Sequence, residues 1–274
     1  DENLKEFPQN KLTKISENEG TKIKLGFLSS DIRRNHSVTY FLKTILSNYD
    51  QDKFEIFLFM NHPKEDQTTK NFENLVYKKI NIFKLGDIET LNKVRELKID
   101  IMIDLMGYTS YQRLNLFKNR LAKKQIIWMG YCNTTGIKNM DYIISDPNVI
   151  KPEEERFYSE KVIYLPEIWN CHCGFDFERE EHKPPLIKND YFTFGSFNNF
   201  DKVNSDVINV WSDILKKIKN SKLVLKTAKD IHATTRIKKI FHEKDVLDSV
   251  KFLNREDKLE DHLNLYKNID ICLD

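Results

Sequence analysis

The sequence predicts an α/β protein made of two units, the first of them a doubly wound parallel sheet. Short apolar segments that end in polar residues alternate with segments whose apolar residues recur every three or four positions, which are the patterns of buried strands and amphipathic helices. This alternation stops between Pro166 and Pro185 and then resumes. The length of 274 residues also suits two domains better than one.

Residues 1–20 are polar and are expected to be a lead-in to the first domain, residues 21–168. That domain begins with a strand over residues 22–30 and a helix over residues 37–49. The apolar residues of this helix share one face: Val38, Phe41, Leu42, Ile45 and Leu46. The other expected strands and helices follow in order: strands at 55–60, 80–85, 100–105, 125–129, 141–145 and 161–165, and helices at 88–98 and 111–121.

Residues 169–188 are expected to be a linker because they are charged and contain turn-forming residues. The second domain, residues 189–274, is predicted to have a similar alternation: strands at 191–197, 222–227, 250–253 and 269–273, and helices at 205–218 and 259–268. The chain ends at Asp274, at the end of a strand, where an open α/β sheet places a ligand loop. We therefore expect the second domain to be incomplete.

Charge and composition argue against several classes of protein. The 44 Lys and Arg residues nearly balance 42 Asp and Glu residues, and a net charge of +2 disfavours a dedicated nucleic-acid-binding protein. The four cysteines have no disulfide spacing, which favours a reducing cytoplasm. No segment has the apolar length of a signal peptide or a membrane span, so no membrane partner is expected.

The loop after the first strand, residues 29–37, is polar and basic and leads into a helix. Open α/β sheets bind their ligands at such carboxyl ends of strands. His36 in this loop can exchange or donate protons near neutral pH, although its position alone is more typical of a surface histidine. The loop lacks a Gly-x-Gly-x-x-Gly motif, which argues against a standard dinucleotide fold.

Two later loops of the first domain combine glycines with hydroxyl groups. Their candidate residues for a sugar or an acceptor are Tyr108, Thr109, Gly130, Thr134 and Thr135. Glycine lets the backbone approach a polar ligand, and hydroxyls form hydrogen bonds with it. Ordinary turn chemistry is the simpler interpretation of both loops.

In the second domain, Asn199 and Lys202 lie between a strand and a helix, where an amide, a lysine and a helix N-terminus can hold a diphosphate. The simpler interpretation is a capping asparagine and a solvated lysine. His262 precedes the last strand and can stack on a base or pack internally. Cys171, His172, Cys173 and His182 form only a weak zinc pattern, because one residue between the cysteines is too few.

A series of motifs occurs in order over about residues 22–274. The motifs are Ser29-Ser30-Asp31 with Asn35-His36, Asp104-Leu105-Met106-Gly107-Tyr108-Thr109, Trp128-Met129-Gly130-Tyr131 with Thr134-Thr135-Gly136, Met140-Asp141-Tyr142-Ile143-Ile144, Tyr158-Ser159-Glu160-Lys161, Phe197-Asn198-Asn199 with Lys202, Trp211, His262, and Asp270-Ile271-Cys272-Leu273-Asp274. This series resembles the O-GlcNAc transferase family, glycosyltransferase family 41, in its bacterial SPINDLY-like branch.

The resemblance implies a GT-B architecture, in which two Rossmann-like domains face each other across a cleft and the second holds most of UDP-GlcNAc. It implies inverting transfer of GlcNAc to Ser or Thr hydroxyls of a protein or peptide, with no metal or other cofactor. His36 corresponds to the family's active-centre histidine, as a base or as a positioning residue. The residues that correspond to the donor site are Asn199 and Lys202 for the phosphates and Asp257, Lys258, Leu259 and His262 for the uridine.

Three departures from the family pattern bear on activity. Leu265 stands where the animal enzymes have a basic residue near the uridine, the His-Thr-Thr donor loop would follow Asp274, and the tetratricopeptide repeats common in the family would precede residue 1. We expect this chain alone to be weak or inactive. Two alternatives remain: a non-catalytic GT-B binding or scaffold protein, and a related transferase that uses another sugar or modifies asparagine.

Overall fold

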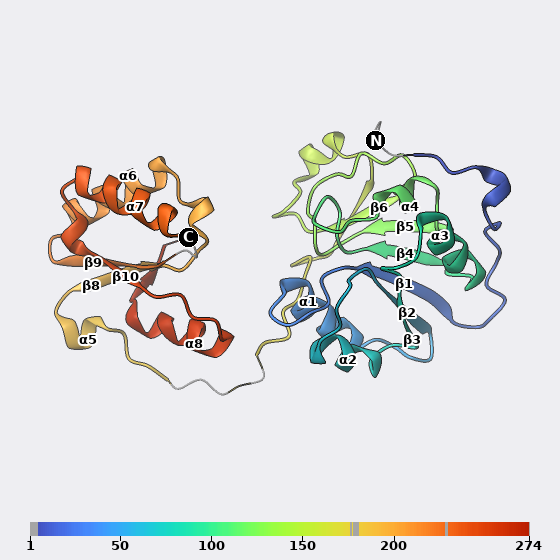
Figure 1. Ribbon diagram of the computed structural model, residues 1–274, viewed down its shortest axis with the longest axis horizontal. Coiled ribbons are helices and arrows are strands. Elements are labelled where there is room, and N and C mark those ends of the chain that lie inside the picture. The colour runs from blue at the N-terminus through green and yellow to red at the C-terminus, as the bar shows by residue number, and fades with distance from the viewer. Residues whose placement is uncertain (1–4, 176, 178–180, 228–229, 274) are drawn as a thin grey trace. The chain divides into compact units, whose positions relative to one another are not determined.

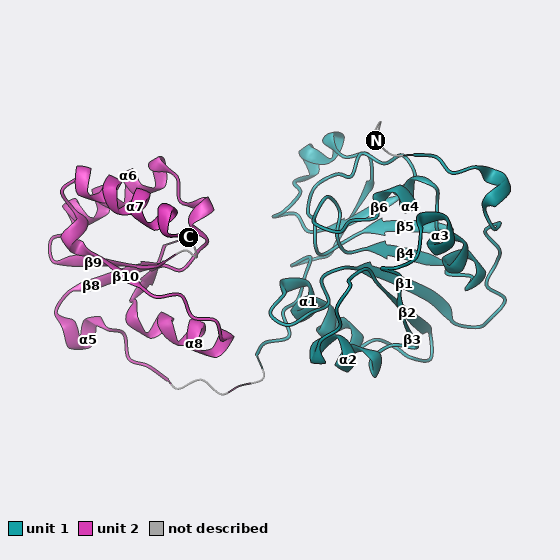
Figure 2. Ribbon diagram, in the orientation of Figure 1, with its two compact units in different colours: residues 1–175 teal, residues 176–274 magenta. Residues whose placement is uncertain are grey.

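The structure, a computed structural model, describes residues 5–175, 177, 181–227 and 230–273. The chain divides into two compact units, residues 1–175 and residues 176–274 (Figure 2). Each unit contains its own parallel sheet (Figure 1). Asp274 and residues 178–180 of the expected linker lie outside the described residues.

Unit 1 has a seven-stranded parallel sheet within its described residues, in the order β3-β2-β1-β4-β5-β6-β7. The strands are β1 (Ile23–Ser29), β2 (Phe54–Met60), β3 (Lys78–Asn81), β4 (Ile101–Asp104), β5 (Lys124–Ile127), β6 (Tyr142–Ser145) and β7 (Lys161–Tyr164). The helices are η1 (Gln9–Lys11), α1 (Ser37–Leu46), α2 (Gln67–Glu73), α3 (Asp87–Glu96), α4 (Leu114–Lys118) and η2 (Pro152–Phe157). The chain reverses its direction of winding between β1 and β4, as in a classical doubly wound fold.

Helices cover both faces of this sheet, and β2 and β4 are accordingly apolar at all but one position each. On β2, Phe57 and Phe59 pack with α3 and α4, whereas Leu58 and Met60 pack with α1 and α2. The apolar face predicted for α1 is confirmed, because Val38, Leu42 and Leu46 are buried in the hydrophobic cluster that contains Leu58 and Met60 of β2. The two hydrophobic cores, one on each face, hold the sheet in place. The loops at the carboxyl ends of its strands are then available to form a site.

Residues 5–20 pack against the rest of unit 1. The apolar side chains Phe7 and Leu12 pack against the core that includes α3 and α4. The side chain of Arg95, which is buried, donates hydrogen bonds to the carbonyls of Thr13, Asn119 and Arg120. Residues 5–20 are therefore attached to the unit by apolar packing and by a hydrogen bond to the Thr13 backbone carbonyl.

Unit 2 has a four-stranded parallel sheet among its described residues, in the order β10-β9-β8-β11. The strands are β8 (Phe192–Ser196), β9 (Ser221–Lys226), β10 (Val250–Leu253) and β11 (Ile271–Cys272). The helices are α5 (Leu186–Asn189), η3 (Phe200–Lys202), α6 (Ser205–Lys217), α7 (Ile231–Glu243), η4 (Leu247–Ser249), α8 (Leu259–Asn264) and η5 (Leu265–Asn268). A core of Phe194, Ile208, Trp211, Leu223 and Phe241 joins the sheet to α6 and α7.

Several expected elements differ from the structure. The helix expected at residues 111–121 is only α4, because Tyr111 and Arg120 adopt positive φ angles of 61° and 55° and end it on both sides. The strand expected at 80–85 is β3, which ends at Asn81, where the Asn81 side chain accepts a hydrogen bond from the Phe83 amide and starts a turn. The helix expected at 259–268 divides into α8 and η5, and α2 and α7 were not anticipated.

Candidate functional site

The candidate residues of unit 1 lie at the carboxyl edge of its sheet, at the point where the winding reverses between β1 and β4. Open α/β sheets bind ligands beside such a point. The loops after β1 and β4 contact each other, because the Ser30 amide donates to the Met106 sulfur and the Ser30 hydroxyl donates to the Ser110 carbonyl. The structure therefore brings the unit 1 candidates to one edge.

His36 is the N-cap residue of α1 and is partly buried. Its Nε2 lies 3.5 Å from Oδ1 of Asp31, a nearly buried residue that also lies 3.7 Å from the Arg33 guanidinium. Burial lowers the pKa of His36, and Arg33 acts in the same direction, whereas the Asp31 charge opposes them. His36 is therefore neutral at pH 7 and can act in proton exchange or as a hydrogen-bonding group.

Asp104, the last residue of β4, lies beneath this loop and is almost completely buried. Its carboxylate accepts hydrogen bonds from the amides of Met106 and Gly107, at 3.3 and 2.8 Å. Burial raises its pKa to about 7, the two amides oppose this shift, and the charge of Asp31 adds to it. No role was predicted for Asp104 from the sequence, although its place at the end of a buried strand was the available signal.

Tyr108 and Thr109 lie in the loop after β4 and are exposed. The Tyr108 hydroxyl donates to the Thr135 carbonyl at 2.7 Å, and the Thr109 hydroxyl donates to the Met106 carbonyl at 2.8 Å. The Tyr108 ring remains 49% exposed and is one wall that a ligand could contact. The Thr109 hydroxyl thus forms a turn hydrogen bond, as the simpler interpretation of this loop expects, whereas the Tyr108 hydroxyl joins this loop to the loop after β5.

The loop after β5 contains Gly130, Thr134 and Thr135 and forms hydrogen bonds with Glu160. The buried Glu160 carboxylate accepts hydrogen bonds from the Thr134 hydroxyl at 2.7 Å, the Thr135 amide at 2.7 Å and the Thr135 hydroxyl. At Gly130, a Cβ atom would overlap the carbonyl oxygen of Leu105. The two threonines therefore fix the conformation of the loop. At Gly130 the loop backbone packs directly against the Leu105 carbonyl at the end of β4.

In unit 2, Asn199 and Lys202 lie in the connection from β8 to α6. The Asn199 amide donates to the Asp201 carboxylate at 2.9 Å and caps η3 by accepting from the Asp201 backbone amide. Lys202, in η3, is exposed, and no hydrogen bond or ion pair joins its ammonium group to another described residue. The asparagine thus behaves as the capping alternative expects, and Lys202 has a free charge at the carboxyl edge.

A second cation, which the sequence analysis did not consider, lies at the same edge. Lys226 is the last residue of β9, and its Nζ lies 3.5 Å from Nδ1 of His262 on α8. Burial lowers the pKa of Lys226, with a further contribution from Arg255, and burial, Lys226 and Arg255 lower the pKa of His262. Within the described chain, no carboxylate pairs with Lys226, so this part-buried positive charge lacks a counter-ion.

Aromatic rings surround His262. Its ring centroid lies 6.3 Å from that of Phe197 and 6.0 Å from that of Tyr266, and Phe197 and Tyr266 contact each other edge to face at 4.8 Å. Phe197 directly follows β8, Lys226 ends β9, and His262 and Tyr266 lie in α8 and η5. We call Lys226, His262, Phe197 and Tyr266 the Lys226 corner.

The remaining donor-site candidates precede or begin α8. Asp257 is exposed and lies 3.9 Å from the Arg255 guanidinium, and Lys258 is the N-cap residue of α8, whose carbonyl accepts the His262 amide. Leu259 begins the helix and is partly buried, and Leu265 lies at its end. These residues therefore lie on the helix that carries His262.

Two of the linker residues considered as zinc ligands, His172 and Cys173, pack against α1. The His172 ring stacks on that of Tyr40 in α1, with centroids 4.9 Å apart, and its Nδ1 accepts from the Gly174 amide. Among the residues that the structure describes, no group of three His, Cys, Asp or Glu side chains could hold a metal ion.

Comparison with known proteins relates the chain to glycosyltransferases. A model of glycosyl transferase family 41 matches residues 4–174. The chain is 34% identical over 208 residues to a protein of Arabidopsis thaliana named probable UDP-N-acetylglucosamine–peptide N-acetylglucosaminyltransferase SPINDLY, over 74% of this chain and 23% of that protein. It is 32% identical over 257 residues to a Hordeum vulgare protein of the same name, over 91% of this chain and 27% of that protein.

Solved structures agree with this relation. A mutant of the Thermobaculum terrenum O-GlcNAc transferase has a TM-score of 0.84 and 26% identity, over 92% of this chain and 48% of that one. The apo form of the lipopolysaccharide outer core galactosyltransferase WaaB has a TM-score of 0.55 at 13% identity, over 91% and 73% of the two chains, and supports the fold alone. The expected GT-B class is confirmed.

The chain spans about a quarter of the length of these curated relatives. In the described part of the chain, no helix has both the length and the apolar character needed to cross a bilayer.

Proposed function

The chain belongs to glycosyl transferase family 41, and from this premise we propose that the protein transfers GlcNAc from UDP-GlcNAc to Ser or Thr hydroxyls of a protein, with inversion at the anomeric carbon. The relatives named above are called peptide N-acetylglucosaminyltransferases, which supports this donor and a peptide acceptor. The coarser conclusion, that the chain is part of a glycosyltransferase, follows from the family itself.

The Lys226 corner is the observation that carries the proposal. A part-buried lysine beside a histidine and an arginine, with no carboxylate partner in the described chain, is an energetically favourable place for an anion. The Tyr266 ring, which is 40% exposed and packs edge to face on the buried Phe197, suits the flat face of a uracil base. An anion attached to a planar base is the chemistry of a nucleoside diphosphate.

The proposed transfer is a displacement at the anomeric carbon. The acceptor oxygen forms a bond to that carbon, the bond from the carbon to the diphosphate oxygen breaks, and UDP leaves with the electron pair; the proton of the acceptor hydroxyl passes to a phosphate oxygen of the leaving UDP or to water. Lys226 and Lys202 would stabilise the negative charge that develops on the diphosphate, and no metal is required for that role. His36 would act at the carboxyl edge of unit 1, in the active centre.

Transfer assays on the protein in its full natural length test this proposal. With Ser- and Thr-containing peptides, mass spectrometry should detect added N-acetylhexosamine from UDP-GlcNAc, and NMR should show inverted anomeric configuration in the product. Lys202→Ala should lose at least about 90% of the rate, whereas Lys217→Ala, a change of an exposed lysine on α6, should not affect it.

The same assays separate the two alternatives. Leu265, at the end of α8 where a basic residue was expected, favours a protein that retains the fold without the chemistry. UDP binding without hydrolysis or transfer would support that scaffold. Transfer from another sugar nucleotide, or to asparagine, would support a related transferase and contradict the donor or acceptor proposed above.

A further inference from the structure

The two ring nitrogens of His36 have different surroundings. Nε2 lies 3.5 Å from the Asp31 carboxylate oxygen. Nδ1 is buried and has no hydrogen-bond partner among the described residues. The ring is therefore not placed like the imidazole of a catalytic triad, where a carboxylate holds one nitrogen and the other faces the substrate.

Asp31 is held rigidly beside this ring. Its amide donates to the Ser29 hydroxyl at 2.9 Å, and its carbonyl accepts from the Thr39 hydroxyl and the Arg33 amide at 3.0 and 2.9 Å. Because these bonds use only its backbone groups, its carboxylate stays available to His36 and to the Arg33 guanidinium. A change of the Asp31 side chain should therefore leave the loop backbone in place.

The two neutral tautomers of His36 are unequal in this setting. With the proton on Nε2, that nitrogen points an N–H at a carboxylate, and the Nδ1 lone pair lies at the N-terminus of α1, whose partial positive charge favours it. With the proton on Nδ1, a lone pair would face the carboxylate and a buried N–H would lack an acceptor. The first tautomer is favoured on both counts.

The other charges near the ring do not change this preference. Arg33 approaches the carboxylate from the same loop, and Asp104 lies beneath Asp31 at the end of β4. Arg33 disfavours a positive ring, Asp31 favours it, and burial disfavours it most, so the pKa of His36 is lowered. The ring is neutral at pH 7, so the tautomer decides which of its two nitrogens carries the proton at that pH.

We propose that Asp31 is a positioning residue that holds neutral His36 with its proton on Nε2, the nitrogen that lies beside the Asp31 carboxylate, so that His36 does not accept a proton at the carboxyl edge of unit 1. In this state neither ring nitrogen can take the proton of an acceptor hydroxyl, because Nε2 already carries one and Nδ1 is buried. The consequence for catalysis rests on the proposed function, but the tautomer itself does not.

NMR of the 274-residue chain with ¹⁵N-labelled histidine tests the proposal without any activity. Long-range ¹H–¹⁵N correlations should show Nε2 protonated and Nδ1 unprotonated in neutral His36. Asp31→Ala should lower the His36 pKa further, because it removes the charge that raises it, and should produce a mixture of tautomers. Asp31→Asn should restore the Nε2-protonated form, because the amide oxygen also places a partial negative charge beside Nε2, but should leave the pKa low.

Arg33→Ala is the matched control, because it removes the other partner of the same carboxylate. It should raise the His36 pKa and leave the tautomer unchanged. A proton on Nδ1 in the wild-type chain, or an unchanged tautomer and pKa in Asp31→Ala, would overturn the proposal. Failure of every transfer assay with the NMR results intact would instead contradict only the proposed function.

Discussion

The Asp104 carboxyl group shows how strongly one position in the fold can change the chemistry of a residue. It is almost fully buried, accepts two backbone amides and lies near Asp31, so its pKa is raised to about 7. Near neutral pH its charge therefore changes directly beneath the loop that carries His36. The residue links the stability of unit 1 to pH.

Asp104 is expected to make unit 1 less stable as pH rises. The unfolded carboxyl group ionises near pH 4 but the folded one near pH 7, so the folded state binds more protons in between and the free energy of unfolding falls over that window. The loss should amount to roughly 2 to 4 kcal/mol. Asp104→Asn should remove most of it, measured as the difference between urea unfolding at pH 5 and at pH 8.

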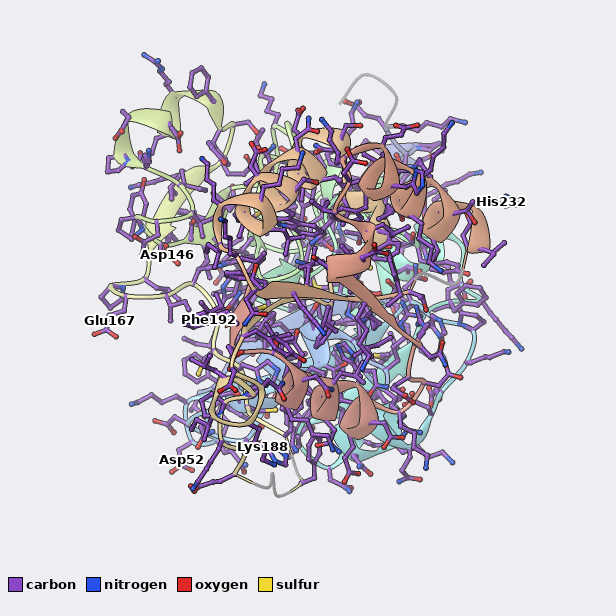
Figure 3. The ribbon with its side chains drawn as sticks, turned by 90° about the vertical axis from the view of Figure 1, so that its left-hand side faces the viewer. Asp52, Asp146, Glu167, Lys188, Phe192 and His232 are labelled. Atoms are coloured by element: carbon purple, nitrogen blue, oxygen red, sulfur yellow. The ribbon has the colours of Figure 1, made fainter. Side chains whose placement is uncertain are left out.

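Asp52→Asn serves as the control for that measurement, because Asp52 is an exposed carboxylate of the same unit (labelled in Figure 3). It should keep the pH dependence of the wild type. An equal loss of stability between pH 5 and pH 8 in wild type and Asp104→Asn would show that Asp104 does not ionise in this range.

Among the elements, the loop after β5 is fixed by close contact with the end of β4. Gly130 lies against the Leu105 carbonyl so closely that no side chain fits, and Gly107, at a φ of 54°, lies against Tyr131. Glu160 holds the other end of the loop through Thr134 and Thr135. The loop is therefore a rigid part of the carboxyl edge.

Gly130→Ala should destabilise unit 1 by about 3 kcal/mol, because the added methyl group would overlap a backbone oxygen that cannot move without shifting β4. Chemical denaturation measures the change. Gly86→Ala, where an added Cβ meets no atom within 4 Å, should cost less than about 1 kcal/mol. Equal stability of the two variants would mean that the loop is not fixed in this way.

Elements with strong periodicity could be predicted from the sequence, and those set by turns could not. The β1 strand and α1 helix lie close to their expected limits because their apolar residues repeat clearly. The α4 helix is short because of backbone conformations at Tyr111 and Arg120 that ordinary residues rarely adopt. The packing of Phe7 and Leu12 was also missed, since two apolar residues in a polar segment show no period.

On the scale of the whole molecule, both units place candidate residues at the carboxyl ends of parallel strands. This rule led from the sequence to His36 and Lys202, whose roles remain predictions. Lys226 also lies at the carboxyl end of a strand but was missed. The sequence alone does not distinguish it from a solvent-exposed lysine, because His262 and Arg255 become its neighbours only in the folded unit. Lys226 was identified from residues that are close to it in space but distant in the sequence.

Titration calorimetry of UDP into the protein in its full natural length tests most directly whether unit 2 holds a nucleoside diphosphate. We expect binding that Lys226→Ala and Lys202→Ala each weaken at least about tenfold, or about 1.4 kcal/mol, while Lys217→Ala binds like the wild type. The absence of UDP binding, or equal affinity in all four proteins, would contradict the account.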